Sequence, residues 1–177
     1  MTELTKFLNQ RQSCRSFSDK RIEDEKIVEC VNAAGLAPSA CNTQPYHFYI
    51  AHTPETVAAA AEFAKFENLN QWADKADAFA IITQEHADIP ALIHQTVRTD
   101  FRAYDIGLAI ENFCLEATEL GIGTCIIGAF NEEKLKEKLR IPSCKKIALL
   151  IAMGYPENNE IRPKKRKALE ELITYLK

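Results

Sequence analysis

Hydrophobic and polar positions along the chain alternate between helical and extended spacing. Apolar residues recur every three or four positions in stretches that predict helices behind Thr2 and over residues 23–34, 54–66, 103–120 and 132 onward. Short apolar runs predict strands over residues 46–51, 79–83, 124–127 and 147–153. The longest periodic stretch, which ends before Gly121, should form the central helix. This alternation predicts an α+β fold with a mixed sheet.

The final segment of the chain is basic at first and then carries regularly spaced apolar residues. Residues 162–167 read R-P-K-K-R-K, and Leu169, Leu172, Ile173 and Leu176 then follow at a spacing that predicts one more helix. With 177 residues, 46% of them hydrophobic, and no internal repeat or linker, we expect one domain over residues 1–177.

Charge and composition narrow the possible partners. Lys and Arg number 22 against 25 Asp and Glu, so no basic excess favours nucleic acid or an anionic membrane. The first residues lack the apolar stretch of a signal peptide, and no apolar run approaches the roughly 20 residues that span a bilayer. We therefore expect a soluble, cytoplasmic protein that has no nucleic-acid or membrane partner.

The cysteines and histidines do not have the spacing of a metal site. Six cysteines are dispersed without a Cys-x-x-Cys pair, and the four histidines form no ligand pattern. We interpret the cysteines as reduced thiols, mostly small packing residues, and expect no metal.

Several common enzyme motifs are missing from the sequence. The segment G-I-G-T-C-I-I-G would need glycine at Ile126 to be a dinucleotide fingerprint, and it follows a helix rather than a strand. No phosphate loop, His-Glu-x-x-His pair or Gly-x-Ser-x-Gly elbow occurs. Nucleotide-dependent phosphoryl transfer, zinc proteolysis and serine hydrolysis therefore lack sequence support.

Two basic segments near opposite ends of the chain are candidate anion sites. In R-Q-S-C-R-S-F, Arg11, Ser13 and Arg15 gather the guanidinium and hydroxyl donors that a phosphate dianion needs. The second segment is the basic run 164–167. Taken singly, surface arginines and a solvated basic run are the commoner explanations.

Two further segments could approach a flat ring. The loop A-P-S-A-C-N-T-Q-P-Y holds polar side chains between two prolines, and its amides suit a heterocycle with donors and acceptors along its edge. The strand in G-T-C-I-I-G-A-F ends at Gly128, where backbone could approach a ring closely. A well-formed turn and a plain buried strand are the alternatives.

The order and spacing of these segments resemble the nitroreductase family of FMN-dependent oxidoreductases. The resemblance includes R-x-S-x-R-x-F, A-P-S-A-x-N-x-Q-P, D-I-G-L-A-I-E-N-F-C-L-E-A, G-I-G-T-C, G-Y-P and R-P-K-K-R-K. It implies a three-layer α/β/α fold with a mixed, mainly antiparallel sheet and a long central helix at the interface of a homodimer. Each of the two FMN molecules would lie in a cleft built from both subunits.

The resemblance also implies a set of cofactor-binding residues: Arg11, Gln12, Ser13, Arg15, Pro38, Ser39, Asn42, Gln44, Ile127, Gly128, Lys164 and Arg166. The basic groups would bind phosphate and ribityl, the loop residues would reach the flavin of the partner subunit, and the strand end would lie against the ring. Asn70 or Gln71 would match a family amide near the flavin edge. Gln12 stands where many relatives carry a basic residue, and Tyr46 replaces a common tryptophan.

The implied activity is two-electron transfer from NADH or NADPH to a small acceptor, such as a nitroaromatic or quinone, by a ping-pong cycle. FMN carries this chemistry, so no catalytic side chain is expected. Alternatives are enone reduction, dehalogenation, flavin fragmentation or a non-catalytic flavin-binding module. Whether residues 85–102 form a lid, and whether Cys41 does more than pack, stays open.

Overall fold

The computed structural model describes residues 1–88, 99–158 and 160–176, and a four-stranded sheet lies at its centre. The strands are β1 (Tyr46–Ala51), β2 (Ala78–Gln84), β3 (Gly123–Ile127) and β4 (Lys146–Gly154), in the order β1-β2-β4-β3. All three strand pairs are antiparallel. Ser13 adds an isolated parallel bridge to Thr124 outside the named strands, so the four strands themselves are antiparallel throughout and parallel pairing is confined to this bridge.

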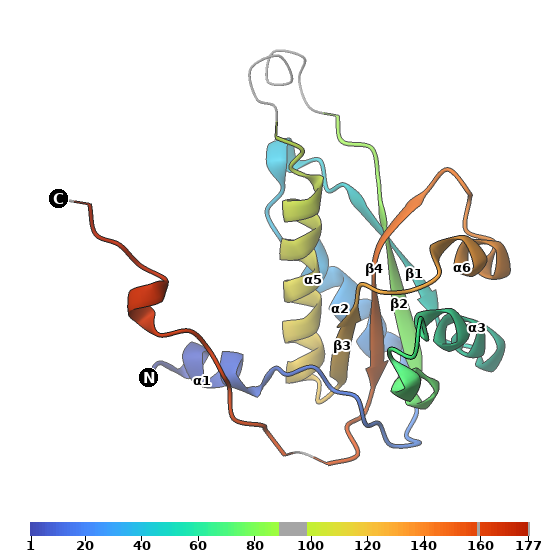
Figure 1. The fold of residues 1–177 in the computed structure, drawn as a ribbon, viewed down its shortest axis with the longest axis horizontal. Helices are drawn as coiled ribbons and strands as arrows, with labels where there is room; N and C mark the ends of the chain where they lie inside the picture. Colours follow the sequence, from blue (N-terminus) through green and yellow to red (C-terminus); the bar gives the residue numbers. More distant parts are fainter. Residues whose placement is uncertain (89–98, 159, 177) are drawn as a thin grey trace.

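Helices cover both faces of this sheet, as Figure 1 shows. Helices α2 (Asp24–Gly35) and α5 (Arg102–Glu119) pack on one face, and α3 (Pro54–Ala64) and α6 (Glu132–Leu139) on the other. Because side chains alternate along a strand, β2 directs Ala80 and Ile82 toward the first helix pair and Phe79 and Ile81 toward the second. The predicted α+β class and three-layer arrangement are confirmed.

Local signals account for where these helices begin. The Thr53 side chain caps α3 by accepting from Thr56 N, and Pro54 occupies the first turn. The Asn131 side chain caps α6 by accepting from Lys134 N. The buried face of α5 carries the residues expected from its periodicity, namely Ile106, Ala109, Ile110, Phe113, Cys114 and Ala117. No helix within the described ranges is long and apolar enough to cross a membrane.

The two ends of the chain have apolar surfaces that its own fold leaves uncovered. Helix α1 (Glu3–Gln10) forms behind its predicted cap Thr2, yet it buries no residue. The prediction of a helix after the basic run 162–167 is wrong, because only the 3-10 turn η3 (Leu169–Glu171) forms there within the described residues. This arm projects from the body (Figure 1) with Leu172 and Leu176 exposed, and an isolated short helix is marginal without a surface to pack on.

Candidate functional site

The segment that follows α1 crosses the start of β3. Cys14 N donates to Thr124 O at 2.8 Å beside the Ser13 bridge. Two glycines allow this close approach: a Cβ on Gly123 would lie 2.7 Å from the Cys14 Cβ, and one on Gly154 would lie 2.7 Å from the Phe17 ring. The sheet edge therefore fixes the backbone that presents the first basic segment.

The basic tail folds back onto the same segment. Arg162 donates through Nε to Gln12 Oε1 at 3.1 Å and through Nη2 to Ser13 O at 2.5 Å. Lys164 Nζ donates to Arg11 O, and Gln12 Nε2 donates to Glu160 O at 2.7 Å. The structure thus brings the two basic segments into contact, although they lie about 150 residues apart in the sequence.

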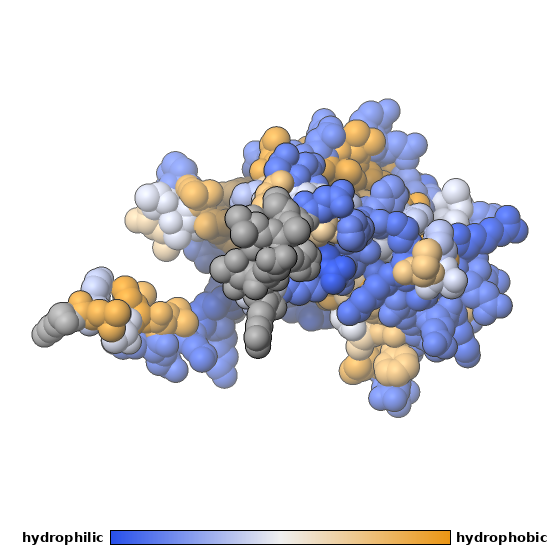
Figure 2. Space-filling model, turned by 90° about the horizontal axis from the view of Figure 1, so that it is seen from above, coloured by the Kyte–Doolittle hydropathy of each residue, from blue (hydrophilic) through white to orange (hydrophobic). Residues whose placement is uncertain are grey.

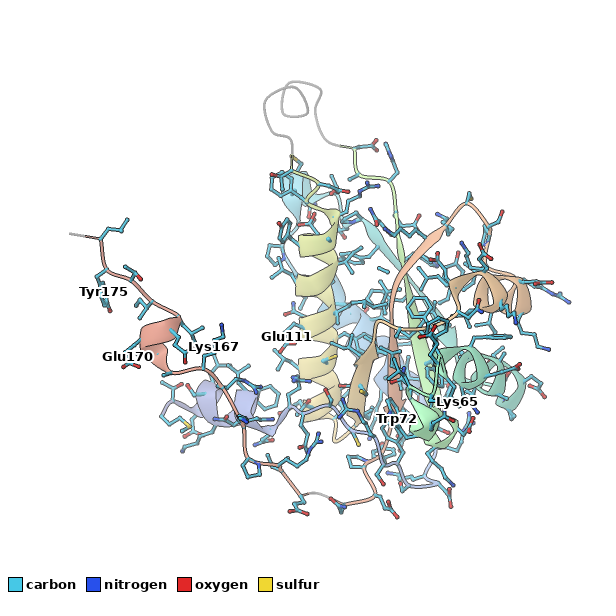
Figure 3. The ribbon with its side chains drawn as sticks, in the orientation of Figure 1. Lys65, Trp72, Glu111, Lys167, Glu170 and Tyr175 are labelled. Carbon is cyan, nitrogen blue, oxygen red and sulfur yellow. The ribbon has the colours of Figure 1, made fainter. Side chains whose placement is uncertain are left out.

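Together these segments enclose a cationic cavity of about 310 Å³. Its lining residues are Arg11, Gln12, Ser13, Arg15, Arg162, Pro163, Lys164, Lys165 and Arg166, so no acidic side chain within the described ranges lines it. Burial lowers the pKa of Lys164, and the charges of Arg11, Arg166 and Arg162 lower it further. Glu111 of α5, which is labelled in Figure 3, has its Oε1 3.8 Å from Arg11 Nε. The donor set fits a phosphomonoester dianion.

A larger cavity of about 680 Å³ adjoins the cationic one. The two share Gln12, Ser13, Arg15 and Arg162. Its other lining residues include Thr118 and Gly121 at the end of α5 and Asn158, Glu160 and Ile161 of the tail. The carboxylate of Glu160 makes this cavity a poorer fit for a phosphate than the smaller one.

The predicted flavin-facing loop lies at the opposite end of α5. Ala40 N donates to both carboxylate oxygens of Asp105, each at 3.2 Å, in the first turn of the helix. The larger cavity lies at the other end of this helix, which rises about 21 Å from Asp105 to Glu119 at 1.5 Å per residue. Arg11 of the cationic cavity contacts Glu111, between the two ends. Neither cavity is lined by any residue of loop 38–44, which Figure 1 shows at the start of α5. Ile127 and Gly128 also line neither cavity.

The loop is held in an unusual backbone conformation. Cys41, Asn42 and Gln44 have φ values of 52°, 55° and 46°, which side-chain-bearing residues adopt rarely. Ser39 Oγ accepts from Gln44 N at 3.0 Å, and Gln44 Nε2 donates to Asn42 O at 3.2 Å. The Asn42 and Gln44 amides thus stand on the surface of a constrained loop, with Cys41 exposed between its turns.

Of the two candidate amides near the flavin edge, Asn70 contacts the loop after β3. Its Nδ2 donates to Ala64 O at 3.0 Å and to Ala129 O at 3.3 Å, next to Gly128. Gln71 Nε2 instead donates to the nearby Leu69 O. The open question of whether residues 85–102 form a lid concerns mainly residues 89–98, which lie outside the described residues.

Two residues of this region were not predicted from the sequence. Arg162 stands within the basic motif, but only its contacts with Gln12 and Ser13 distinguish it from a solvated arginine. Asp105 reads as an ordinary acidic residue of a first helical turn, and only its burial and its contact with Ala40 mark it.

Comparison with known proteins agrees with this architecture. Residues 8–155 match the sequence model described as Nitroreductase family. The chain belongs to the nitroreductase family. A nitroreductase family relative in Archaeoglobus fulgidus, whose name joins NADH dehydrogenase with NAD(P)H nitroreductase, is 32% identical over 164 residues, covering 90% of this chain and 89% of its own.

Two further proteins resemble this family member along nearly its whole length. The oxygen-insensitive NADPH nitroreductase of Helicobacter acinonychis is 29% identical over 205 residues, covering 96% of this chain and 94% of its own. A protein of Exiguobacterium sibiricum, solved in complex with FMN, superposes with a TM-score of 0.84 at 19% identity, covering 99% of this chain and 98% of the other. The second likeness concerns the fold alone.

Proposed function

We propose that this nitroreductase family member is an FMN-dependent oxidoreductase that moves two electrons from NADH or NADPH to a small acceptor, such as a nitroaromatic or quinone. The observation that carries the proposal is the cationic cavity in which both ends of the chain meet. The NADPH-dependent relative and the FMN-bound fold neighbour support it.

The chain's own residues bind and orient the cofactor in this proposal. Arg11, Ser13, Arg15, Lys164 and Arg166 hold the phosphate and ribityl chain, and Gln12 fixes Arg162 beside them. Pro38, Ser39, Asn42 and Gln44 flank the flavin edge, while Ile127 and Gly128 lie along the ring. When bound, FMN supplies hydride acceptance and donation, so no side chain has to react. A shared site for donor and acceptor then gives the ping-pong order.

A homodimer completes the site. Loop 38–44 lines neither cavity of its own chain, so in this proposal a second copy brings its amides to the flavin held by the cations. The chain also exposes large apolar side chains that a second copy could cover. Tyr104 and Leu108 of α5 are 65% and 47% exposed, and Leu4 of α1 is 64% exposed. Figure 2 shows further apolar surface on the projecting arm, which carries Leu169, Leu172, Ile173 and Leu176.

The visible spectrum of the purified protein tests the proposal. We expect bound FMN, bleaching on anaerobic addition of NADH or NADPH, and steady turnover with excess quinone. A preparation that is colourless and gains no spectrum with added FMN contradicts the flavin site. A flavin that reduces slowly or not at all identifies a non-catalytic binding module instead.

A double variant tests the phosphate site. Arg11→Ala with Arg166→Ala should raise the FMN dissociation constant about a hundredfold, since each charge-assisted contact contributes several-fold or more. Lys167→Ala is the matched control, because this neighbour (labelled in Figure 3) does not line the cavity. Unchanged affinity in the double variant would move the phosphate elsewhere.

A further inference from the structure

Asp105 is the one charged side chain buried within the described part of the chain, at 5% exposure. It stands in the first turn of α5, and both of its oxygens lie 3.2 Å from Ala40 N. A buried carboxylate is costly unless it is hydrogen-bonded, and removal of its partner leaves that cost uncompensated. The Ala40 contact therefore couples the central helix firmly to loop 38–44.

Loop 38–44, which contains Ala40, has a backbone conformation that needs an external restraint. Three of its residues, Cys41, Asn42 and Gln44, have left-handed φ values although none is glycine. Such conformations persist only where the surroundings enforce them. Within the loop, Ser39 Oγ accepts from Gln44 N, and from outside the loop Asp105 accepts from the neighbouring Ala40 N.

Helix α5, which carries Asp105, is itself held against helix α2. Asn112 Nδ2 of α5 donates to Ala33 O of α2 at 3.2 Å, and Tyr46 OH donates to Ala34 O at 3.3 Å. Burial raises the pKa of Tyr46, and the charge of Asp105 adds to this effect. Both ends of the loop thus join a rigid helix pair.

We infer that Asp105 is a positioning residue for the flavin. Its carboxylate holds the Ala40 amide and so keeps loop 38–44 in the conformation that presents the Asn42 and Gln44 amides. The inference rests on the proposed function, in which this loop flanks the flavin bound to the partner subunit. Asp105 does not itself touch the flavin in this account, so its effect is on binding and ring environment rather than on chemistry.

Asp105→Ala, Asp105→Asn and Asp100→Ala test this inference. Asp100 is a matched control because its carboxylate accepts from the Arg102 backbone and side chain near the same helix end, without contact to the loop. Apo-protein is titrated with FMN by fluorescence, and hydrogen exchange is followed by mass spectrometry on peptides spanning residues 38–44. The exchange measurement needs no flavin and no activity.

We expect Asp105→Ala to raise exchange in the loop and to raise the FMN dissociation constant about tenfold, the effect of losing one hydrogen bond to a charged group. Asp105→Asn keeps an acceptor oxygen and should stay within about threefold of the wild type. Asp100→Ala should match the wild type in both measurements. Recovery by asparagine separates positioning from a general effect on folding.

Faster loop exchange with unchanged FMN affinity in Asp105→Ala would overturn the inference while leaving the proposed function intact. Failure of the wild type to bind FMN would instead overturn the proposed function, before any variant is compared. If Asp105→Ala does not fold, Asp105→Ser enters the same titration, since it removes the carboxylate but keeps a small polar group. Wild-type affinity in that variant would equally overturn the inference.

Discussion

Lys164 shows how a residue placed for a ligand can oppose stability in the free protein. Its charge is disfavoured by burial and by Arg11, Arg166 and Arg162, so its pKa lies below the usual 10.5. A bound phosphate dianion would instead favour the protonated, positively charged form of Lys164. The cationic cavity therefore holds electrostatic repulsion that the cofactor relieves.

Lys164→Gln should weaken FMN binding about tenfold while leaving the apo-protein at least as stable as the wild type at neutral pH. Because the folded pKa lies below 10.5, the folded wild type binds fewer protons than the unfolded chain between the two values. Wild-type stability thus rises with pH across that window, and the variant lacks this rise. Urea unfolding at several alkaline pH values and FMN titration measure both effects, with Lys167→Gln as control.

Gly123→Ala tests the close approach at the sheet edge. The new Cβ would meet Cys14 Cβ at 2.7 Å and Sγ at 2.8 Å, so the segment carrying Ser13 has to shift. We expect a loss of about 1–3 kcal/mol in the free energy of unfolding, together with weaker FMN binding. Gly35→Ala, where a Cβ meets nothing within 4 Å, is the control in the same denaturation assay. Equal stability of the two variants would contradict the packing argument.

At the scale of elements, single side chains join segments that the sequence leaves separate. Glu132, in the first turn of α6, accepts from Ile147 N of β4 at 2.9 Å and from Lys136 Nζ at 3.1 Å. Burial raises the pKa of Glu132, but these two donors together outweigh it and the net shift is downward. The ionised carboxylate therefore holds α6 to the sheet.

Glu132→Ala should lower the free energy of unfolding by about 1–3 kcal/mol at neutral pH, because Ile147 N loses its acceptor. The contribution is present above the ordinary pKa of 4.5 and disappears as pH falls through the lowered folded value. The difference between variant and wild type in urea unfolding should accordingly shrink in acid. Glu133→Ala, at the exposed neighbouring position, is the control, and an equal loss there would contradict the assignment.

Element positions were the most predictable part of the fold. The caps Thr2, Thr53 and Asn131 and the turn at Gly121 depend on a few neighbouring residues, so local sequence was sufficient. The C-terminal segment has the same kind of apolar spacing as α5, but spacing does not reveal whether a surface exists for it to pack against. That difference explains why one helix formed and the other did not.

At the scale of the whole molecule, the exposed apolar residues of α1, α5 and the arm are best accounted for by a second copy of the chain. The exposed residues of α1 and α5 lie on regular helices, whereas those of the arm lie mostly outside regular structure. In addition, the loop at Ala40 does not line the cationic cavity of its own chain. The homodimer, the single domain over residues 1–177 and the cytoplasmic location remain predictions.

Leu108→Asp should dissociate the dimer and reduce FMN retention together, since the charge would enter the proposed interface on α5. Val28→Asp is a matched control, because Val28 is 57% exposed on α2 and is equally a helix-surface aliphatic residue. Sedimentation velocity gives the oligomeric state, and absorbance of the sedimenting species gives bound flavin. A dimeric Leu108→Asp variant with full flavin content would exclude this face of α5 from the interface.

The sequence by itself determined the alternation of helices and strands, the family, and the positions of two basic segments and an amide-bearing loop along the chain. These features depend on local spacing and on the order of motifs, which the linear chain contains. Only the tertiary structure decided that Arg162 joins the basic cluster, that Asp105 contacts the loop, and that the loop does not line the cationic cavity of its own chain. Such contacts join residues about 65 to 150 positions apart, and their formation depends on packing in three dimensions rather than on neighbours in the chain.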